Sequence, residues 1–95
     1  MLGLCAMAMA YDALGRRTES DARLAGAIAK FQTDALYQIA LVYAFRGQRD
    51  QAFEWLNRAY TERDAGLSEI KCDPLMNALK HDPRYEALLR KLQLL

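Results

Sequence analysis

ALYQIALVYAFRGQRDQAFEWLNRAYTERD, residues 35–64, decides the fold of this chain of 95 residues. Apolar residues recur at three-and-four spacing in both halves of the stretch, at Leu36, Ile39, Ala40 and Tyr43 and again at Ala52, Leu56, Ala59 and Tyr60. Gly47 interrupts the pattern between the halves, where a glycine with positive φ ends a helix readily. The stretch therefore predicts two helices that fold back on each other.

The same pattern occurs once before, about 32 residues earlier in the chain. The matched pairs are Leu4 and Leu36, Met7 and Ile39, Ala8 and Ala40, Tyr11 and Tyr43, Gly15 and Gly47, Leu24 and Leu56, and Ala27 and Ala59. Alanines let the helices approach closely, tyrosines fill the space between them, and glycines end the first helix. We therefore expect one hairpin over residues 1–32 and another over residues 33–66. Thr18 or Ser20 is expected to cap the second helix of the first copy, and Asp50 that of the second.

Residues 67–95 depart from the repeat. Two Asp-Pro steps, Asp73-Pro74 and Asp82-Pro83, each place a capping aspartate before a proline at the first helical position. A short helix and a longer one are expected here, and together they present one apolar and one polar face. Such a pair of closing helices suits the end of a stack of hairpins.

The two hairpins resemble tetratricopeptide repeats, in which a Trp-x2-Leu-Gly-x2-Tyr helix precedes an Ala-x3-Phe helix. The matching positions hold Leu36, Ile39, Ala40, Tyr43, Ala52 and Leu56, with leucine in place of the tryptophan and alanine in place of the glycine. The resemblance implies an all-α fold whose hairpins stack into a right-handed superhelix. Residues 52–92 also resemble the C-terminal tetratricopeptide tail of larger bacterial regulatory proteins.

Net charge and hydropathy limit the classes of function that the chain can have. The chain carries 13 basic and 12 acidic residues, a net charge of +1, so it lacks the basic surface of a nucleic-acid binder. Six of its nine arginines, at positions 16, 17, 46, 49, 58 and 63, alternate with acids and are expected on solvated faces. The apolar start is shorter than the ~20 residues that span a membrane. The two cysteines, Cys5 and Cys72, are expected to be buried thiols, and the protein cytoplasmic.

Catalytic and metal-binding patterns are missing from the sequence. The one histidine, His81, lies in an expected turn with no nucleophile beside it, so we predict no enzyme activity. Cys72, Asp73, His81 and Asp82 lack the spacing of zinc ligands, and both aspartates are explained as helix caps. No glycine-rich phosphate loop is present. We predict neither a metal nor a cofactor.

A groove is the more informative prediction. In stacked hairpins the first helix of each pair lines the concave face, where residues off the core stripe contact a guest. These residues are Cys5, Met9, Asp12, Tyr37, Leu41 and Phe45. Because they are mainly apolar, the expected partner is a protein or peptide with an apolar segment. The alternative is that a closing helix or a second copy of the chain covers the same stripe.

The first helix also predicts self-association. Leu2, Leu4 and Met7 are apolar around much of its circumference, and two repeats are fewer than the three or so that a stable stack needs. We expect a homodimer through this helix. The predicted function is a non-catalytic protein-interaction module, an adaptor or an oligomerisation unit. The alternative is a regulatory C-terminal tail of a bacterial signalling enzyme or transcription regulator.

Overall fold

The computed structural model describes residues 2–31, 35–64, 66–67, 70–71 and 73–92. Its elements are α1 (Leu2–Ala13), α2 (Arg17–Phe31), α3 (Leu36–Phe45), α4 (Arg49–Thr61), the 3-10 helix η2 (Pro74–Leu79) and α5 (Pro83–Lys91). No strand occurs among these residues, which confirms the expected all-α class.

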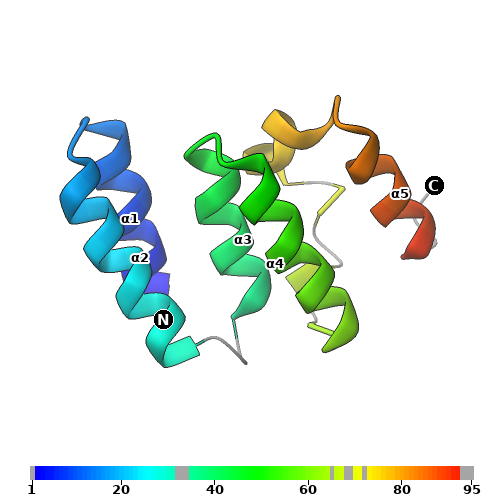
Figure 1. Ribbon diagram of the computed structural model, residues 1–95, viewed down its shortest axis with the longest axis horizontal. Coiled ribbons are helices and arrows are strands. Elements are labelled where there is room, and N and C mark those ends of the chain that lie inside the picture. Colours follow the sequence, from blue (N-terminus) through cyan, green and yellow to red (C-terminus); the bar gives the residue numbers. More distant parts are fainter. Residues whose placement is uncertain (1, 32–34, 65, 68–69, 72, 93–95) are drawn as a thin grey trace.

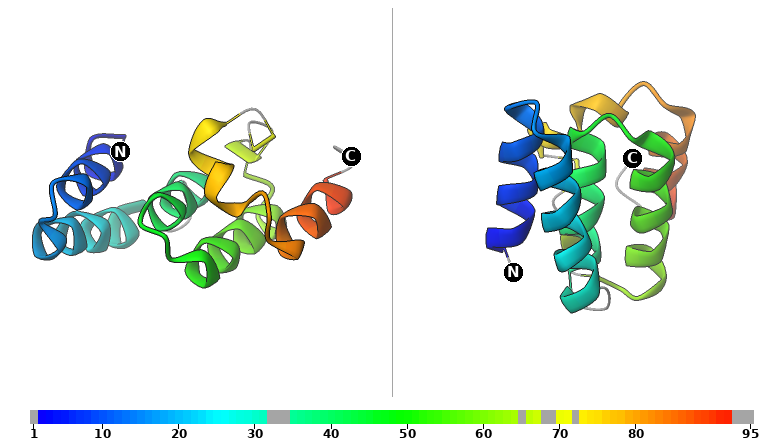
Figure 2. Two further views of the ribbon diagram at one scale, coloured as in Figure 1. Left: turned by 90° about the horizontal axis from the view of Figure 1, so that it is seen from above. Right: turned by 60° about the vertical axis from the view of Figure 1, so that its left-hand side comes forward.

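The helices form two successive hairpins and a closing segment (Figure 1). Helices α1 and α2 pack against each other as the first hairpin, and α3 and α4 as the second. Helix α3 also contacts α1, α2 and η2, while α4 contacts α5. Seen from above, α1, α3 and η2 lie along one side of the molecule and α2, α4 and α5 along the other (Figure 2). Helix α3 is therefore the central element, and on average its residues are the most hydrophobic of the five α-helices.

The turns inside the two hairpins have the same geometry. Gly15 and Gly47 have φ values of +76° and +78°, which confirms their predicted role in ending helices. In the first turn the N–H groups of Gly15 and Arg16 donate to the carbonyls of Asp12 and Tyr11, and the second turn repeats both bonds 32 positions later. This paired bond pattern is the Schellman cap, in which a left-handed residue lets the chain satisfy the last helical carbonyls.

The end of α4 uses the same cap with a different residue. Arg63 has a φ of +57°, its N–H donates to the Tyr60 carbonyl, and the N–H of Asp64 donates to the Ala59 carbonyl. An arginine in the left-handed region is disfavoured because its Cβ crowds the following carbonyl oxygen. Three helix ends in the described part of the chain are thus of one kind, and the third of them has arginine in place of glycine.

The core runs through both hairpins and the closing segment. Its largest fully buried hydrophobic side chains are Leu36, Ile39, Val42, Leu56, Ile70, Met76 and Leu79. Trp55 is buried, and Arg58 lies over its ring at 4.1 Å from the centroid. The matched alanines of the repeat, Ala8, Ala27, Ala40 and Ala59, are all 0% exposed, so they lie where the helices approach most closely.

Two capping predictions are wrong, and the first fails for both of its residues because Thr18 and Ser20 lie inside α2, which begins at Arg17. Ser20 lies inside α2, fully buried, and its hydroxyl donates to the Ala8 carbonyl of α1 at 2.7 Å, so it joins two helices. Asp50 lies in the first turn of α4, and the N-cap of that helix is Gln48, which makes no side-chain capping bond. The spacing of polar residues before a helix could not distinguish a capping side chain from one that packs against another helix.

The expectation of solvated arginines is also wrong at one position. Arg46 stands at the end of α3 with only 4% of its side chain exposed, and it pairs with Asp21 of α2. This ion pair shows which face of α3 points toward the first hairpin. Ile39 and Val42, seven and four residues before Arg46, lie on the same helical face and are fully buried.

Asp64 links the two ends of the second hairpin. Helix α3 begins after Ala35, which has no side chain able to cap it. Instead Asp64, just beyond the end of α4, accepts a hydrogen bond from the N–H of Tyr37 at 3.2 Å and another from the N–H of Gly66 at 2.8 Å. A carboxylate at this point also interacts favourably with the positive end of the helix dipole.

The closing segment partly matches its prediction. Asp82 caps α5 as expected, because its side chain accepts from the Arg84 N–H and Pro83 occupies the first helical position. After Asp73-Pro74, however, the chain forms the 3-10 helix η2 rather than an α-helix. Its residues Met76 and Leu79 are fully buried, and its contacts are with α3.

Candidate interaction surface

The structure places the groove residues of the first hairpin at different depths. Cys5 is 3% exposed, and burial raises the pKa of its thiol. Met9 is half-buried against the core. Asp12 is paired with Arg17 at 3.1 Å and keeps 16% of its side chain exposed. Only Met9 and Asp12 therefore offer part of their side chains to a partner.

In the second hairpin the closing segment reaches the predicted groove stripe. Tyr37 is 3% exposed and its hydroxyl donates to the Asp73 carboxylate at 2.9 Å. A Cβ added at Gly66 would lie 2.9 Å from the Cβ of Tyr37, so the chain passes over this tyrosine where only glycine fits. The alternative of an internal cover thus applies to Tyr37. Leu41 is half-buried, while Phe45, at the other end of α3, is 39% exposed.

The three residues predicted for self-association do not share one environment. The side chain of Leu2 lies outside the described part of the chain. Leu4 is half-buried and points toward α2, because a Cβ at Gly26 would lie 3.8 Å from both of its methyl groups. Met7 is 37% exposed. Of these three, Met7 is the described side chain that an outside partner can reach most easily.

Met7 belongs to an exposed apolar face that the sequence prediction did not define. We call it the α1 outer face, and its residues are Gly3, Ala6, Met7, Ala10, Ala13 and Leu14. Their three-and-four spacing puts them on one side of the helix, opposite the buried Cys5 and Ala8. None has a polar side chain, and Leu14 is 70% exposed. The spacing is present in the sequence, but four of the six residues are glycine or alanine, whose small side chains make the apolar pattern weak.

The equivalent face of α3 is covered over most of its length. Shifting the α1 outer face by 32 positions gives Ala35, Gln38, Ile39, Val42, Phe45 and Arg46. Three of these residues, Ala35, Ile39 and Val42, are fully buried, and the Arg46–Asp21 ion pair directs this face toward the first hairpin. Most of this side of the repeat is thus buried in the second hairpin and exposed in the first, and the first hairpin lies at one end of the row of helices (Figure 1).

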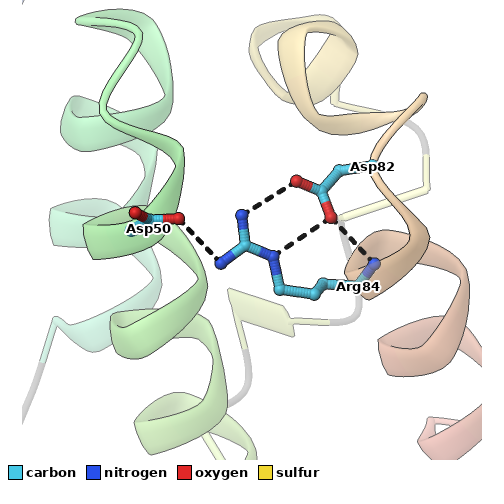
Figure 3. Close-up of polar contacts among 3 residues, drawn as sticks. All are labelled: Asp50, Asp82 and Arg84. Carbon is cyan, nitrogen blue, oxygen red and sulfur yellow. Dashed lines mark hydrogen bonds and ion pairs between the residues drawn. The ribbon is translucent and has the colours of Figure 1, made fainter.

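A second feature that the sequence missed is a polar cleft between the start of α4 and the start of α5. Its volume is about 410 Å³, and its lining comprises Gly47, Gln48, Arg49, Asp50, Gln51, Asp82 and Arg84. Figure 3 shows Arg84 between the two aspartates, 3.0 Å from Asp50 and 2.9 Å from Asp82. The guanidinium also lies over the Phe53 ring, 4.5 Å from its centroid.

The charges of this cleft compensate one another. The Arg84 hydrogen bonds lower the pKa of Asp82 to about 2, and the same contacts raise the pKa of Arg84. Each guanidinium contact in Figure 3 connects α5 to itself or to α4. The Arg84–Asp50 pair therefore joins the closing helix to the second hairpin at the surface, where an exposed ion pair adds little stability, and the guanidinium already has two carboxylate partners.

Other candidate chemistry is sparse in the described residues. His81 is exposed in the turn between η2 and α5. Within the part of the chain that the structure describes, no three His, Cys, Asp or Glu side chains lie together as a group able to hold a metal ion. None of the described helices has the length and apolar character needed to cross a membrane.

Comparisons with known proteins add no assignment. The chain matches no protein-family model, no curated protein and no solved structure. The candidate surface therefore rests on the geometry of the chain itself: an exposed apolar face on α1, and partly exposed apolar side chains at Met9, Leu41 and Phe45.

Proposed function

We propose that this protein is a non-catalytic protein-interaction module, an adaptor or oligomerisation unit built from stacked helical hairpins of the tetratricopeptide type. The observation that carries the proposal is the α1 outer face, which is exposed and wholly apolar, while Ala35, Ile39 and Val42 of its counterpart on α3 are fully buried. Burial of such an apolar helix face against another protein lowers the free energy of the system, because apolar surface is removed from water.

The partner we propose is a protein segment with apolar side chains. It contacts the α1 outer face, and on the concave side it meets Met9, Leu41 and Phe45, which keep part of their surface accessible. Charge plays a small part, because the outer face contains no ionised group. Shape and apolar area therefore determine which partner fits.

A photo-reactive amino acid placed at Ala10 tests this function in cells that produce the protein. Residue 10 is in the centre of the outer face, so we expect discrete covalent adducts on illumination. Ala25, an exposed alanine of α2, is the matched control position. Adding Met7→Glu to the Ala10 probe should remove the adducts, since a charge then enters the apolar contact. Equal labelling from positions 10 and 25 would show that the face has no partner.

The same observation favours a second candidate, the C-terminal regulatory tail of a bacterial signalling enzyme or transcription regulator. In that case another hairpin of a longer polypeptide covers the α1 outer face, as the first hairpin covers α3. The reading frame upstream of Met1 tests this candidate. A catalytic or DNA-binding domain encoded in frame would support it, and a stop codon directly upstream would exclude it.

A further inference from the structure

We infer that the first hairpin is a separately opening unit. In this opening α1 and α2 leave α3 and unfold together, while the second hairpin and the closing segment stay folded. The inference goes beyond the proposed function, because it concerns how the fold itself moves and not what the protein binds. It starts from the uneven distribution of the core. Among the described residues of α1 and α2, the buried hydrophobic ones are Cys5, Ala8, Leu24 and Ala27.

The remaining helices contain much larger buried side chains. Those of α3, α4, η2 and α5 include Leu36, Phe53, Trp55, Leu56, Leu79 and Tyr85. Half-buried residues do not offset this difference, because the described chain has three packed on the core in each part: Leu4, Met9 and Ile28 in the first hairpin, and Leu41, Tyr43 and Leu92 elsewhere. Burial stabilises a fold in proportion to the apolar area removed from water, so the free energy of opening should be lowest at the first hairpin.

The two helices of the first hairpin depend on α3 to stay folded. Helices α1 and α2 have 12 and 15 residues, and isolated helices shorter than ~12–15 residues are marginal in water. Gly26 lies inside α2 and weakens it further, since glycine is a poor helix former. A Cβ at this position would lie 3.8 Å from the Leu4 methyl groups, which is an ordinary contact, so packing does not require the glycine. Detachment from α3 should therefore unfold α1 and α2 as one unit.

The first hairpin joins the rest of the fold through one helix. It lies at one end of the row of helices, and its main contacts with the other elements are with α3 (Figure 1). The packing of α3 on α4 and η2, and of α4 on α5, does not involve it. Its departure therefore leaves those contacts in place and uncovers the side of α3 that carries Ala35, Ile39 and Val42.

The ion pair across the junction sets the balance between the closed and the open form. The Arg46 side chain is 4% exposed, and it pairs with Asp21 of α2, whose side chain is 58% exposed. The Nε and Nη1 atoms of Arg46 are buried without a hydrogen-bond acceptor among the described residues. Burial of a cation costs hydration that one half-exposed carboxylate repays only in part, and detachment returns the guanidinium to water. Asp21 therefore holds the junction closed, and the burial of Arg46 favours its opening.

Hydrogen–deuterium exchange of the full chain, read by mass spectrometry under native conditions, tests the inference. The conditions are chosen so that exchange reports the equilibrium fraction of opened chains. After correction for intrinsic rates, the amides of α1 and α2 should exchange as one group, at least about tenfold faster than those of α3 and α4. Equal protection of the two hairpins would show that the chain opens only by global unfolding, and it would overturn the inference.

Two conservative variants test the order of opening. Ile70 is fully buried in the closing segment, and Ile70→Val should speed exchange in α3 and α4 by about fivefold. It should leave α1 and α2 unchanged, because the closing segment is still folded when they open. Gly26→Ala should slow exchange in all four helices by about fivefold, since it stabilises the closed form relative to every open one. Equal acceleration of both hairpins by Ile70→Val would contradict a separate first step.

Variants of the ion pair test what controls the junction. Asp21→Asn leaves Arg46 without a charged partner and should speed exchange of α1 and α2 at least about tenfold. Arg46→Met removes the buried charge and keeps an apolar stem, so exchange should be no faster than in the wild type. Glu19→Gln, an exposed acid of α2 that pairs with Arg16 inside the first hairpin, is the control and should change exchange less than about threefold. Equal acceleration by Asp21→Asn and Arg46→Met would overturn the role of the buried charge.

Discussion

Replacement of Asp64 by alanine is the most direct test of how the second hairpin and the closing segment are held together. The Asp64 carboxylate accepts hydrogen bonds from the backbone N–H groups of Tyr37 and Gly66, at 3.2 and 2.8 Å. The first of these groups lies in the opening turn of α3, where Ala35 provides no side-chain cap. Asp64→Ala therefore leaves two backbone donors without the acceptor that the fold supplies.

The size of the effect can be worked out from these contacts. A hydrogen bond to a charged group contributes about 1.5–3 kcal/mol when buried, and the half-buried position of Asp64 places both bonds at the lower end. Loss of the carboxylate at the positive helix end adds about 0.3–1 kcal/mol. We expect the free energy of unfolding to fall by about 3–4 kcal/mol. A domain of this size has only about 5–14 kcal/mol in total.

Urea denaturation followed by far-ultraviolet circular dichroism measures this change. With a slope of about 1–1.5 kcal/mol per molar urea, the midpoint should fall by about 2–4 M. Asp64→Asn should lose roughly half as much, because the amide keeps one acceptor oxygen and loses the charge. Glu62→Ala, an exposed acid two residues earlier, is the control and should change the free energy by less than about 0.5 kcal/mol. An Asp64→Ala value as small as that of the control would refute the capping role.

Three further predictions concern single positions. Arg63→Gly should raise the free energy of unfolding by about 0.5–1 kcal/mol, seen as a higher melting temperature, because glycine adopts the φ of +57° without a Cβ clash. Ser20→Ala should lower it by about 1 kcal/mol in urea denaturation, since the buried bond to the Ala8 carbonyl is lost. Arg84 lowers the pKa of Asp82 from 3.8 to about 2, so this pair stabilises the fold fully above pH 3.8 and progressively less down to pH 2. The difference in unfolding free energy between the wild type and Asp82→Asn, measured from pH 7 to pH 2, should therefore shrink below pH 4, and a difference that stays constant would contradict the pairing.

Helix class and helix ends could be predicted from the sequence because they depend on neighbours along the chain. Three-and-four apolar spacing, a glycine with positive φ at Gly15 and Gly47, and an aspartate before proline at Asp82 are local features. Side chains that act between helices could not be assigned in this way. Ser20 and Asp50 resemble helix caps in the sequence. The Ser20 hydroxyl instead donates to a carbonyl of the neighbouring helix α1, and the Asp50 carboxylate pairs with Arg84.

The candidate interaction surface was likewise predictable only in part from the sequence. The apolar character of the first helix was evident from its composition, so the expectation of an interaction surface there needed no structure. Which residues of α1 face outward depends on how the helix is rotated about its axis as it packs on α2 and α3. In this packing Leu4 points inward, and Ala6, Ala10 and Leu14 are exposed. The sequence could not show that Tyr37 of the predicted groove is covered. The segment that covers it follows α4, and its path over Tyr37 depends on tertiary contacts.

By itself the sequence determined that this chain is helical, that its first two helices are repeated by the next two, and where several helices end. Those properties follow from backbone conformation and from the period of apolar residues, which act over a few positions of the chain. Only the tertiary structure decided that Arg46 is buried against α2, that Asp64 caps α3, and that an uncharged face of α1 stays open. These contacts join residues far apart in sequence, so they depend on how the helices pack.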